Sequence, residues 1–532
     1  MEHLEHKRKI MIMLAIMAAM LFAALNQTIV GTALPRIIAE LGGIEYFSWV
    51  FTIFMLASSI TAVLVGKLSD IYGRKPFILT GIAVFSVGSL MAGFSNGMIE
   101  LIIYRGVQGL GGGLIMSTAF TAVADLFSPR ERGRWQGLMG SVFGLASVFG
   151  PTLGGWIVDN ADWHWVFWVF LPFGVLAFIL ILTLFPSVEK KPGEKVDYSG
   201  SLFLTTTIVP LLLAFSWAGS KYDWSSSQII GLFAAAVVSL IIFILIERKA
   251  KSPVLPLHLF KNNVFTLSNL IGFIMGAGMF GAAMYIPFFI QGVIGRSATS
   301  SGLIMMPMTL SMVAASTLGG QFITKTGKYK ALAITGLLIM AGGMFSLSFM
   351  DVNSSATVVI LNNILIGTGL GMSFPVFTLT IQNAVDHRYL GVATASAQLF
   401  RQIGGTVGVA VMGTIMNLRM SDKIAEAGKE PGAQLAQNPQ LVAQLKDLDP
   451  QVLMDPARLA SIQAKIPAEF QPVFERLVGM LRDSLGYALT GVYWIAAFIV
   501  LTGFVLTFFL KEIPLRQSQK PGQGDETKEK AI

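Results

Sequence analysis

Apolar stretches of about 20 residues or more recur along nearly the whole of this 532-residue sequence. Each is long enough to cross the hydrocarbon core of a bilayer as a helix. Because a bilayer offers no water to unpaired backbone groups, continuous runs of this kind predict helices rather than barrel strands. Charged residues make up only 13% of the chain and hydrophobic residues 54%. The sequence therefore predicts an all-α integral membrane protein with many spans.

The apolar stretches correspond to fourteen predicted spans. They cover residues 10–33, 46–66, 76–95, 99–120, 135–158, 164–186, 199–219, 227–246, 265–290, 299–322, 331–350, 356–379, 392–417 and 486–511. Lys and Arg gather in the loops of the face that holds both termini, whereas the short loops of the other face contain only Arg36, Lys221 and Arg296. The positive-inside rule then predicts cytoplasmic termini. Because the net charge of +8 is dispersed over these loops, we expect a lipid bilayer and no nucleic acid as partner.

Several kinds of chemistry are disfavoured by what the sequence lacks. The chain has no cysteine, which excludes disulfides, thiol catalysis and cysteine-ligated metals. It has no phosphate-binding G-x-x-x-x-G-K-S/T sequence, so an ATP-driven pump is disfavoured. The histidines of the terminal stretch HLEH (3–6) do not predict a metal site. We expect no metal, no cofactor and no enzymatic activity.

Polar residues inside the predicted spans are few and therefore informative. Asn26 begins an Asn-Gln-Thr triplet near the middle of the first span, and only Arg105 and Arg401 are basic residues well inside spans. No acidic residue lies deep in a span, and Asp125 is the nearest. A charge at membrane depth costs about 2.5–3.5 kcal/mol on insertion scales, which makes such residues functional candidates. We expect Arg105 to have a nearby partner, with Asn26 as the candidate.

Residues 66–76, GKLSDIYGRKP, resemble the signature loop of the major facilitator superfamily. Gly66 would permit a close approach of helices, and Gly73 would make a turn. Asp70 could cap a helix N-terminus or pair with an arginine such as Arg74. The resemblance implies that this loop locks one face of a transporter while the other face is open.

Two further stretches resemble motifs of the same superfamily. Residues 101–113, LIIYRGVQGLGGG, are similar to its span-four motif, with Arg105 and Gly109 in register. Residues 147–156, SVFGPTLGGW, resemble the antiporter motif of its span five. This second resemblance is carried by Gly150, Pro151, Gly154 and Gly155. Glycine and proline at these positions would permit a bent helix and tight packing.

An internal repeat indicates two related halves. Residues 320–330, GQFITKTGKYK, repeat the glycine spacing and the following basic residues of 66–76. The resemblance implies a major facilitator fold of two six-helix bundles with two extra helices between them. The predicted parts are a first bundle in 1–190, two linker helices in 191–262, a second bundle in 263–511 with an outer loop at 418–485, and a disordered tail in 512–532. We expect the outer loop to form a surface cap with short amphipathic helices.

Fourteen spans together with TIVGTALP at 28–35 are similar to the fourteen-span drug:proton antiporter family. Residues 285–307 also resemble this family, and residues 162–174 do so with His164 and Phe170 in place of its usual Arg and Asn. The resemblance covers about residues 10–417 and 486–511. It implies a monomer in the plasma membrane of a bacterium that exports amphipathic compounds, with protons as the coupling ion.

The chain departs from this family at Asn26, where the family typically has an aspartate that is thought to couple protons. A buried carboxyl beside an arginine can switch its protonation, whereas an amide cannot titrate and imitates the protonated acid. Three interpretations remain open. The native residue could be Asp, with Asn26 a substitution; the chain could couple through Asp125 or Asp70; or it could be an uncoupled facilitator. We expect substrate binding to survive and pH-dependent coupling through this position to be lost, with Arg105 polarising residue 26.

The leading functional hypothesis is export of amphipathic organic compounds, which would bind near the midplane between the halves. The candidate lining residues are Phe22, Asn26, Tyr285, Phe289 and Gln398. The absence of deep acidic residues argues against a dedicated site for polyvalent cations. One alternative is a lipid or glycolipid exporter on the same fold, and another is a membrane receptor or scaffold that transports nothing.

Overall fold

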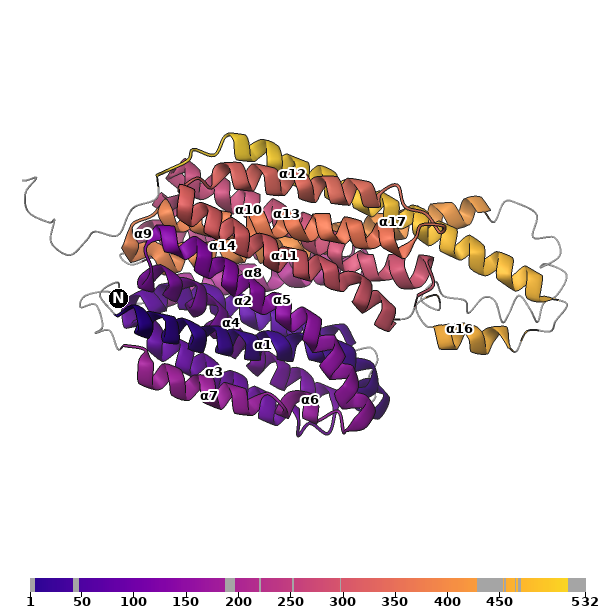
Figure 1. Cartoon of the computed structure of the whole chain (residues 1–532), viewed down its shortest axis with the longest axis horizontal. Helices are drawn as coiled ribbons and strands as arrows, with labels where there is room; N and C mark the ends of the chain where they lie inside the picture. The colour runs from indigo at the N-terminus through magenta and orange to yellow at the C-terminus, as the bar shows by residue number, and fades with distance from the viewer. Residues whose placement is uncertain are drawn as a thin grey trace, which may run out of the picture.

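The computed structural model describes residues 5–41, 47–186, 197–219, 222–250, 253–296, 298–427, 453, 456–464, 466 and 470–514. Among these residues, fourteen helices are long and apolar enough to cross a membrane. The predicted all-α architecture with fourteen spans is therefore confirmed. Figure 1 shows the helices running side by side in two bundles, the N-terminal one in indigo and purple and the C-terminal one in pink to yellow.

The first bundle contains six spans, and the sixth is broken near its start. Its elements are α1 (His6–Leu41), α2 (Phe47–Tyr72), α3 (Arg74–Ala92), α4 (Met98–Leu126), α5 (Pro129–Asn160), α6 (Trp165–Trp168) and α7 (Leu171–Leu184). The start of α5 follows from its sequence, because Ser128 and Glu131 form a capping box around Pro129 at the first helical position. Pro172 occupies the first turn of α7, a position that tolerates its missing N–H.

Two linker helices precede the second bundle. They are α8 (Tyr198–Trp217) and α9 (Ser227–Lys249), followed by the short η2 (Leu257–Lys261). The second bundle consists of α10 (Asn263–Phe288), the π-helical turn η3 (Phe289–Val293), α11 (Ala298–Thr326), α12 (Lys330–Leu347), α13 (Ala356–Asn383), η4 (His387–Tyr389), α14 (Leu390–Ala427), α16 (Pro456–Gln463) and α17 (Gln471–Phe508). The side chains of Asp197 and Ser226 cap the first turns of α8 and α9 by accepting backbone N–H bonds.

Buried apolar side chains form one core in each bundle and a third between them. The first core includes Ile16 and Phe85, and the second includes Met340 and Val492. The third joins α8 to α2 and α14 and includes Ile208. The linker helix α8 therefore packs where the two bundles meet, on the side formed by α2 and α14.

The internal repeat is visible in the backbone. Gly73 between α2 and α3 has φ +84°, and Gly327 between α11 and α12 has φ +72°. Both lie in the left-handed region that glycine reaches without steric cost. The equivalent turns of the two bundles are thus made in the same way, as the spacing of 66–76 and 320–330 predicts.

Three predicted boundaries need correction. The first span continues as helix to Leu41. Helix α14 extends about three turns into the predicted outer loop, to Ala427, and α17 covers about four turns of the same loop, from Gln471. The α14 extension packs against α17, since Arg419 of α14 stacks on the Tyr487 ring of α17 with its Cζ 4.2 Å from the ring centroid. Much of the rest of the loop, including 428–452, lies outside the described residues.

The start of the predicted tail is also ordered. The Glu512 carboxylate accepts a hydrogen bond from the backbone N–H of Tyr329 at 2.8 Å, and the Ile513 N–H donates to the Tyr329 hydroxyl at 2.7 Å. The chain is therefore held against the 327–330 turn as far as Pro514. The remainder of the predicted tail, 515–532, lies outside the described residues.

Candidate functional site

Asn26 is part of a fully buried polar network inside the first bundle. The Gln108 side-chain amide of α4 donates to Asn26 Oδ1 at 3.0 Å and to Ser89 Oγ of α3 at 2.6 Å. Asn26 Nδ2 donates to the same Ser89 hydroxyl at 3.3 Å. None of these three side chains has measurable solvent exposure. Three helices thus meet around one amide–amide–hydroxyl cluster, in which the groups satisfy one another as buried polar groups must.

Arg105 is attached to this network through Gln108. Its Nη1 donates to Gln108 Oε1 at 2.9 Å, and its Nε donates to the Val50 carbonyl at 3.4 Å. Its Cζ lies 4.5 Å from the centroid of the Phe54 ring, which supplies a cation–π contact. Its Nη2 is buried and has no hydrogen-bond partner in the described part of the protein. The site therefore holds a buried cation without a paired carboxylate.

The expectation that Asn26 is the direct partner of Arg105 needs correction. The two side chains are joined through Gln108, which accepts from one and donates to the other. Sequence reasoning missed Gln108 and Ser89. A glutamine three residues after an intramembrane arginine was a usable signal, because positions three apart share a helix face.

Glycines in α4 bring its neighbours close enough to build the network. A Cβ on Gly109 would lie 2.5 Å from the Phe54 carbonyl of α2, and one on Gly111 would lie 2.5 Å from the Phe85 amide of α3. The glycine run at 109–113 is therefore a packing feature between α2 and α3. The close approach of α3 brings Ser89 within hydrogen-bonding reach of Gln108.

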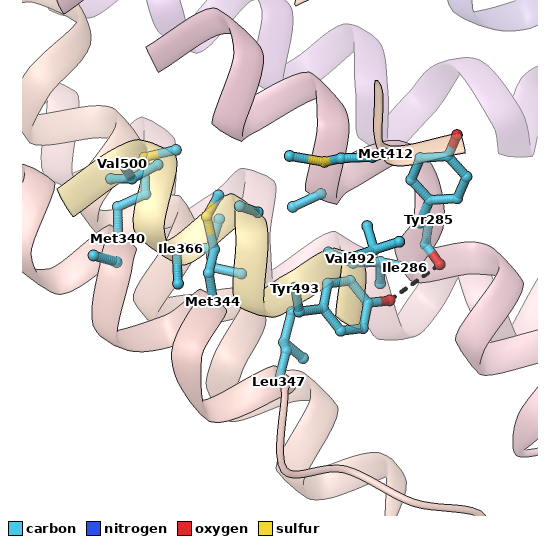
Figure 2. Packing of buried hydrophobic residues seen from close by; sticks show 14 of the residues in the cluster. Tyr285, Ile286, Met340, Met344, Leu347, Ile366, Met412, Val492, Tyr493 and Val500 are labelled. Atoms are coloured by element: carbon cyan, nitrogen blue, oxygen red, sulfur yellow. Dashed lines mark hydrogen bonds between the residues drawn. The ribbon is translucent and has the colours of Figure 1, made fainter. Parts of the chain in front are cut away.

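The aromatic candidates for a substrate pocket lie inside separate bundles. Phe22 is 1% exposed and packs edge-on against Phe85 in the first core. Phe289 is 1% exposed in the second core. The Tyr285 hydroxyl donates to the Val409 carbonyl at 3.0 Å, and Figure 2 shows the Tyr285 carbonyl accepting from Tyr493. In this conformation Phe22 packs in the core of the first bundle, and Tyr285 and Phe289 pack in that of the second.

The loop at 66–76 joins the two bundles at the face where α1 begins. Asp70 Oδ1 accepts from the Gly391 N–H at 3.1 Å, and Asp70 Oδ2 accepts from the Val392 N–H at 3.3 Å. These are the first backbone donors of α14, where a carboxylate is favoured by the helix dipole. Arg74 pairs with Asp70 and, through Nε, with Asp125 at 2.8 Å.

Burial and close packing define this inter-bundle contact. Burial raises the pKa of the Asp70 carboxyl above its ordinary value, and the adjacent Arg74 guanidinium opposes that rise. A Cβ on Gly66 would lie 2.6 Å from Ala395 Cβ and 2.9 Å from the Gly391 carbonyl. Only a residue without a side chain therefore lets α2 approach α14 this closely, as expected for Gly66.

A second polar contact between the bundles lies deeper. Gln136 of α5 donates to Gln382 of α13 at 3.0 Å, and Gln382 donates to Thr394 of α14 at 2.9 Å. The Phe374 ring of α13 lies 6.5 Å from the Phe120 ring of α4. Gln382 also donates to the Phe120 carbonyl at 3.4 Å. The two bundles thus also meet deeper in the membrane than the Asp70 contact, first at Gln136 and Gln382 and then at the Phe120 and Phe374 rings.

The glycines of the span-five motif differ in their surroundings. A Cβ on Gly150 would overlap Thr28 of α1, whose hydroxyl donates to the Ala146 carbonyl at 2.9 Å. A Cβ on Gly155 would meet nothing within 4 Å. Gly154 is buried, and Pro151 lies within the continuous helix α5. The close contact between α1 and α5 therefore requires a glycine at position 150, whereas position 155 has room for a side chain.

Comparison with known proteins gives a consistent result. The sequence model described as Major Facilitator Superfamily matches residues 16–409. The chain is 40% identical to the multidrug transporter protein MdtP of Bacillus subtilis (strain 168), over 99% of this chain and 97% of that protein. It is 34% identical to multidrug resistance protein 3 of the same organism, over 94% of each.

Solved structures agree on the fold. The human organic anion transporter MFSD10 superposes with a TM-score of 0.60 at 14% identity, covering 92% of this chain and 99% of that one. The proton:xylose symporter XylE superposes with a TM-score of 0.59 at 15% identity, covering 96% and 98%. The match to the family over most of the spans, together with relatives aligned over nearly their full length, shows that this chain belongs to the major facilitator superfamily and is a membrane transporter rather than an enzyme.

Proposed function

We propose that this protein exports amphipathic organic compounds by alternating access. The supporting observation is its 40% identity, over nearly the whole of both chains, to a protein named as a multidrug transporter. A second relative is named as a multidrug resistance protein, and a further one, from Gibberella fujikuroi, as an efflux pump. Under this proposal the chain lies in the cell membrane of a bacterium, as a monomer with both termini in the cytoplasm.

The contacts between the bundles support the transport cycle. Asp70 holds the start of α14, and Gln136 holds Gln382, both on the side where α1 begins. To release this side the two bundles must separate these contacts, while the opposite ends approach each other. A compound bound between the bundles would then be exposed first to one side of the membrane and then to the other.

The network around residue 26 supports a specific statement about coupling. A carboxylate at this position would accept from Gln108 and Ser89 and lie within the field of Arg105, so its charge would depend on the network. Asn26 supplies the same shape without a proton that can be exchanged. We infer that coupling to protons through this position is impaired in the chain as it stands.

Transport by the purified full-length protein in proteoliposomes tests both parts of the proposal. The probe is phenylnaphthylamine, a neutral amphiphilic dye, followed with and without an imposed pH gradient. We expect the protein to move the dye at a rate that the gradient changes by less than about twofold, since residue 26 cannot titrate. Asn26→Asp should make the rate depend on the gradient.

Gln27→Glu is the matched control, because it introduces an acid at the neighbouring, partly exposed position outside the network. It should behave as the unchanged protein does. If the protein moves no dye, the export proposal is wrong, and translocation of a labelled lipid would then favour the lipid exporter. If Asn26→Asp matches Gln27→Glu in all respects, residue 26 is not a coupling position.

A further inference from the structure

One face of α14 lies against the Gln136–Gln382 contact between the bundles. Thr394 lies on this face, since it accepts a hydrogen bond from Gln382, which in turn contacts Gln136 of the other bundle. Gln398 and Arg401 follow Thr394 by four and seven residues, which places them on the same face of the helix. Arg401 is therefore about 10 Å farther along α14 than the Gln136–Gln382 contact, toward the opposite side of the membrane.

Arg401 packs on an aromatic side chain that contacts the other bundle. Its Cζ is 4.1 Å from the centroid of the Phe374 ring. That ring packs against Phe120 of the first bundle at 6.5 Å. Below this aromatic pair come the Gln136–Gln382 contact and then the Asp70 contact. The Arg401 guanidinium thus lies against an aromatic contact that joins the two bundles.

The contacts between the bundles continue along α5 and α11. They include Gly137, which lies beside Ser316, and Gly144, where a Cβ would overlap Val313 and lie 3.2 Å from Thr309. Arg401 itself is partly exposed, whereas Arg105 has no exposure. The Arg401 side chain is therefore partly accessible, whereas that of Arg105 is sealed inside the first bundle.

Arg401 also lacks a counter-charge. No ion pair joins it to a carboxylate in the described part of the chain, whereas Arg74 has two such partners. A guanidinium at membrane depth is costly, and its planar fork of donors is shaped for carboxylate or sulfonate oxygens. The Phe374 ring beside it and the partly exposed surface around it suit a ligand that is apolar next to its anionic group.

We propose that Arg401 binds the anionic group of acidic substrates, and that the exported compounds therefore include amphipathic organic acids. This inference rests on the proposed export function and names its substrate class. Arg401 supplies a charge-assisted hydrogen bond to the acid, and Gln398, one turn earlier and 9% exposed, supplies a second polar group. The apolar body of the substrate packs along Phe374. Arg105, sealed in its own network, takes no part in this contact.

A matched pair of dyes tests the proposal. Anilinonaphthalene sulfonate and phenylnaphthylamine share one aromatic body and differ in a sulfonate. Uptake of each is measured in proteoliposomes of the full-length protein and corrected with liposomes that lack protein. We expect the protein to transport both. Arg401→Gln should lower transport of the sulfonate about tenfold or more while changing phenylnaphthylamine by less than about twofold.

Two further variants keep the test decisive. Arg401→Lys retains the positive charge but loses the planar set of guanidinium donors. It should therefore raise the KM for the sulfonate dye while part of the transport of that dye remains. Arg296→Gln removes one positive charge from an exposed loop and should leave both dyes unchanged. Thermal melting of each purified variant in detergent reports whether it is folded.

The outcomes separate this inference from the proposed function. Transport of phenylnaphthylamine alone, or equal sensitivity of both dyes to Arg401→Gln, would overturn the anion site while leaving export intact. If Arg296→Gln lowered sulfonate transport as much as Arg401→Gln, the net charge of the protein would explain the effect. That result would also overturn the anion site. Failure of the unchanged protein to move either dye would contradict the export function itself.

Discussion

The Asp70 carboxylate of α2 caps the first turn of α14 by accepting the Gly391 N–H at 3.1 Å. One side chain from the first bundle thereby completes a helix of the second. The same carboxylate pairs with Arg74, which also binds Asp125, so three charged groups of the first bundle are organised around a backbone terminus of the other. Opening of this face must break the cap.

Asp70→Asn should weaken this inter-bundle contact. The amide loses the ion pair with Arg74, and its NH₂ group cannot accept from the backbone of α14. We expect dye transport in proteoliposomes to fall about tenfold or more, since removal of one partner of a buried charge pair costs several kcal/mol. Asp386→Asn is the control, because Asp386 lies near the same helix end but is exposed. Equal activity of the two variants would contradict the proposed role of Asp70.

Ser141 and Thr317 allow the closed face to be trapped. Their hydroxyl oxygens lie 3.5 Å apart across α5 and α11, and the chain has no other cysteine that could compete for a disulfide. The double variant Ser141→Cys with Thr317→Cys should crosslink under mild oxidation and lose transport, and a reductant should restore it. Each single variant serves as the control. A crosslinked protein that transports at the full rate would rule out movement at this interface.

Gly150 and Gly155 provide a matched pair within one motif. Gly150→Ala should lower the melting temperature of the purified protein and its transport rate, because the new Cβ would overlap Thr28 and push α1 from α5. Gly155→Ala should change neither, since open space surrounds the position. Equal melting temperatures for the two variants would show that the α1–α5 contact does not depend on Gly150.

Gln108 should be essential to the network that connects Asn26 with Arg105. Gln108→Leu leaves Arg105 Nη1 and Asn26 Oδ1 without their partner, which we expect to cost about 1–3 kcal/mol for each unsatisfied group. The melting temperature in detergent measures the loss. The control is Gln228→Leu at an exposed position of α9, which should have little effect. Unchanged stability of Gln108→Leu would mean that the network contributes nothing to the fold.

The architecture could be predicted from the sequence because it depends on local properties. Apolar runs and the sorting of basic residues between loops are sufficient to predict fourteen spans, and the spacing around Gly73 and Gly327 predicts two equivalent turns. Helix ends were less predictable. The polar end of α14 packs on α17 through contacts such as Arg419 with Tyr487, which the local sequence does not reveal.

The site could be predicted only in part. Asn26, Arg105 and Asp70 stand out locally, as polar groups in apolar surroundings or in a motif. Their partners depend on tertiary packing: Gln108 reaches Asn26 across 82 positions, and the Gly391 N–H reaches Asp70 across 321. The roles of aromatic residues such as Phe22 and Phe289 could not be predicted. An aromatic residue in an apolar span can pack in a bundle core or line a pocket, and the sequence looks the same in both cases.

Proton release on substrate binding tests the central claim most directly, namely that an uncharged amide occupies the coupling position. The purified protein is placed in weak buffer with a pH indicator, and phenylnaphthylamine is added. We predict no release from the unchanged protein and release approaching about one proton per molecule from Asn26→Asp, because binding would then displace an exchangeable proton. Equal release from both proteins would contradict the claim, since the proton would come from a group other than residue 26.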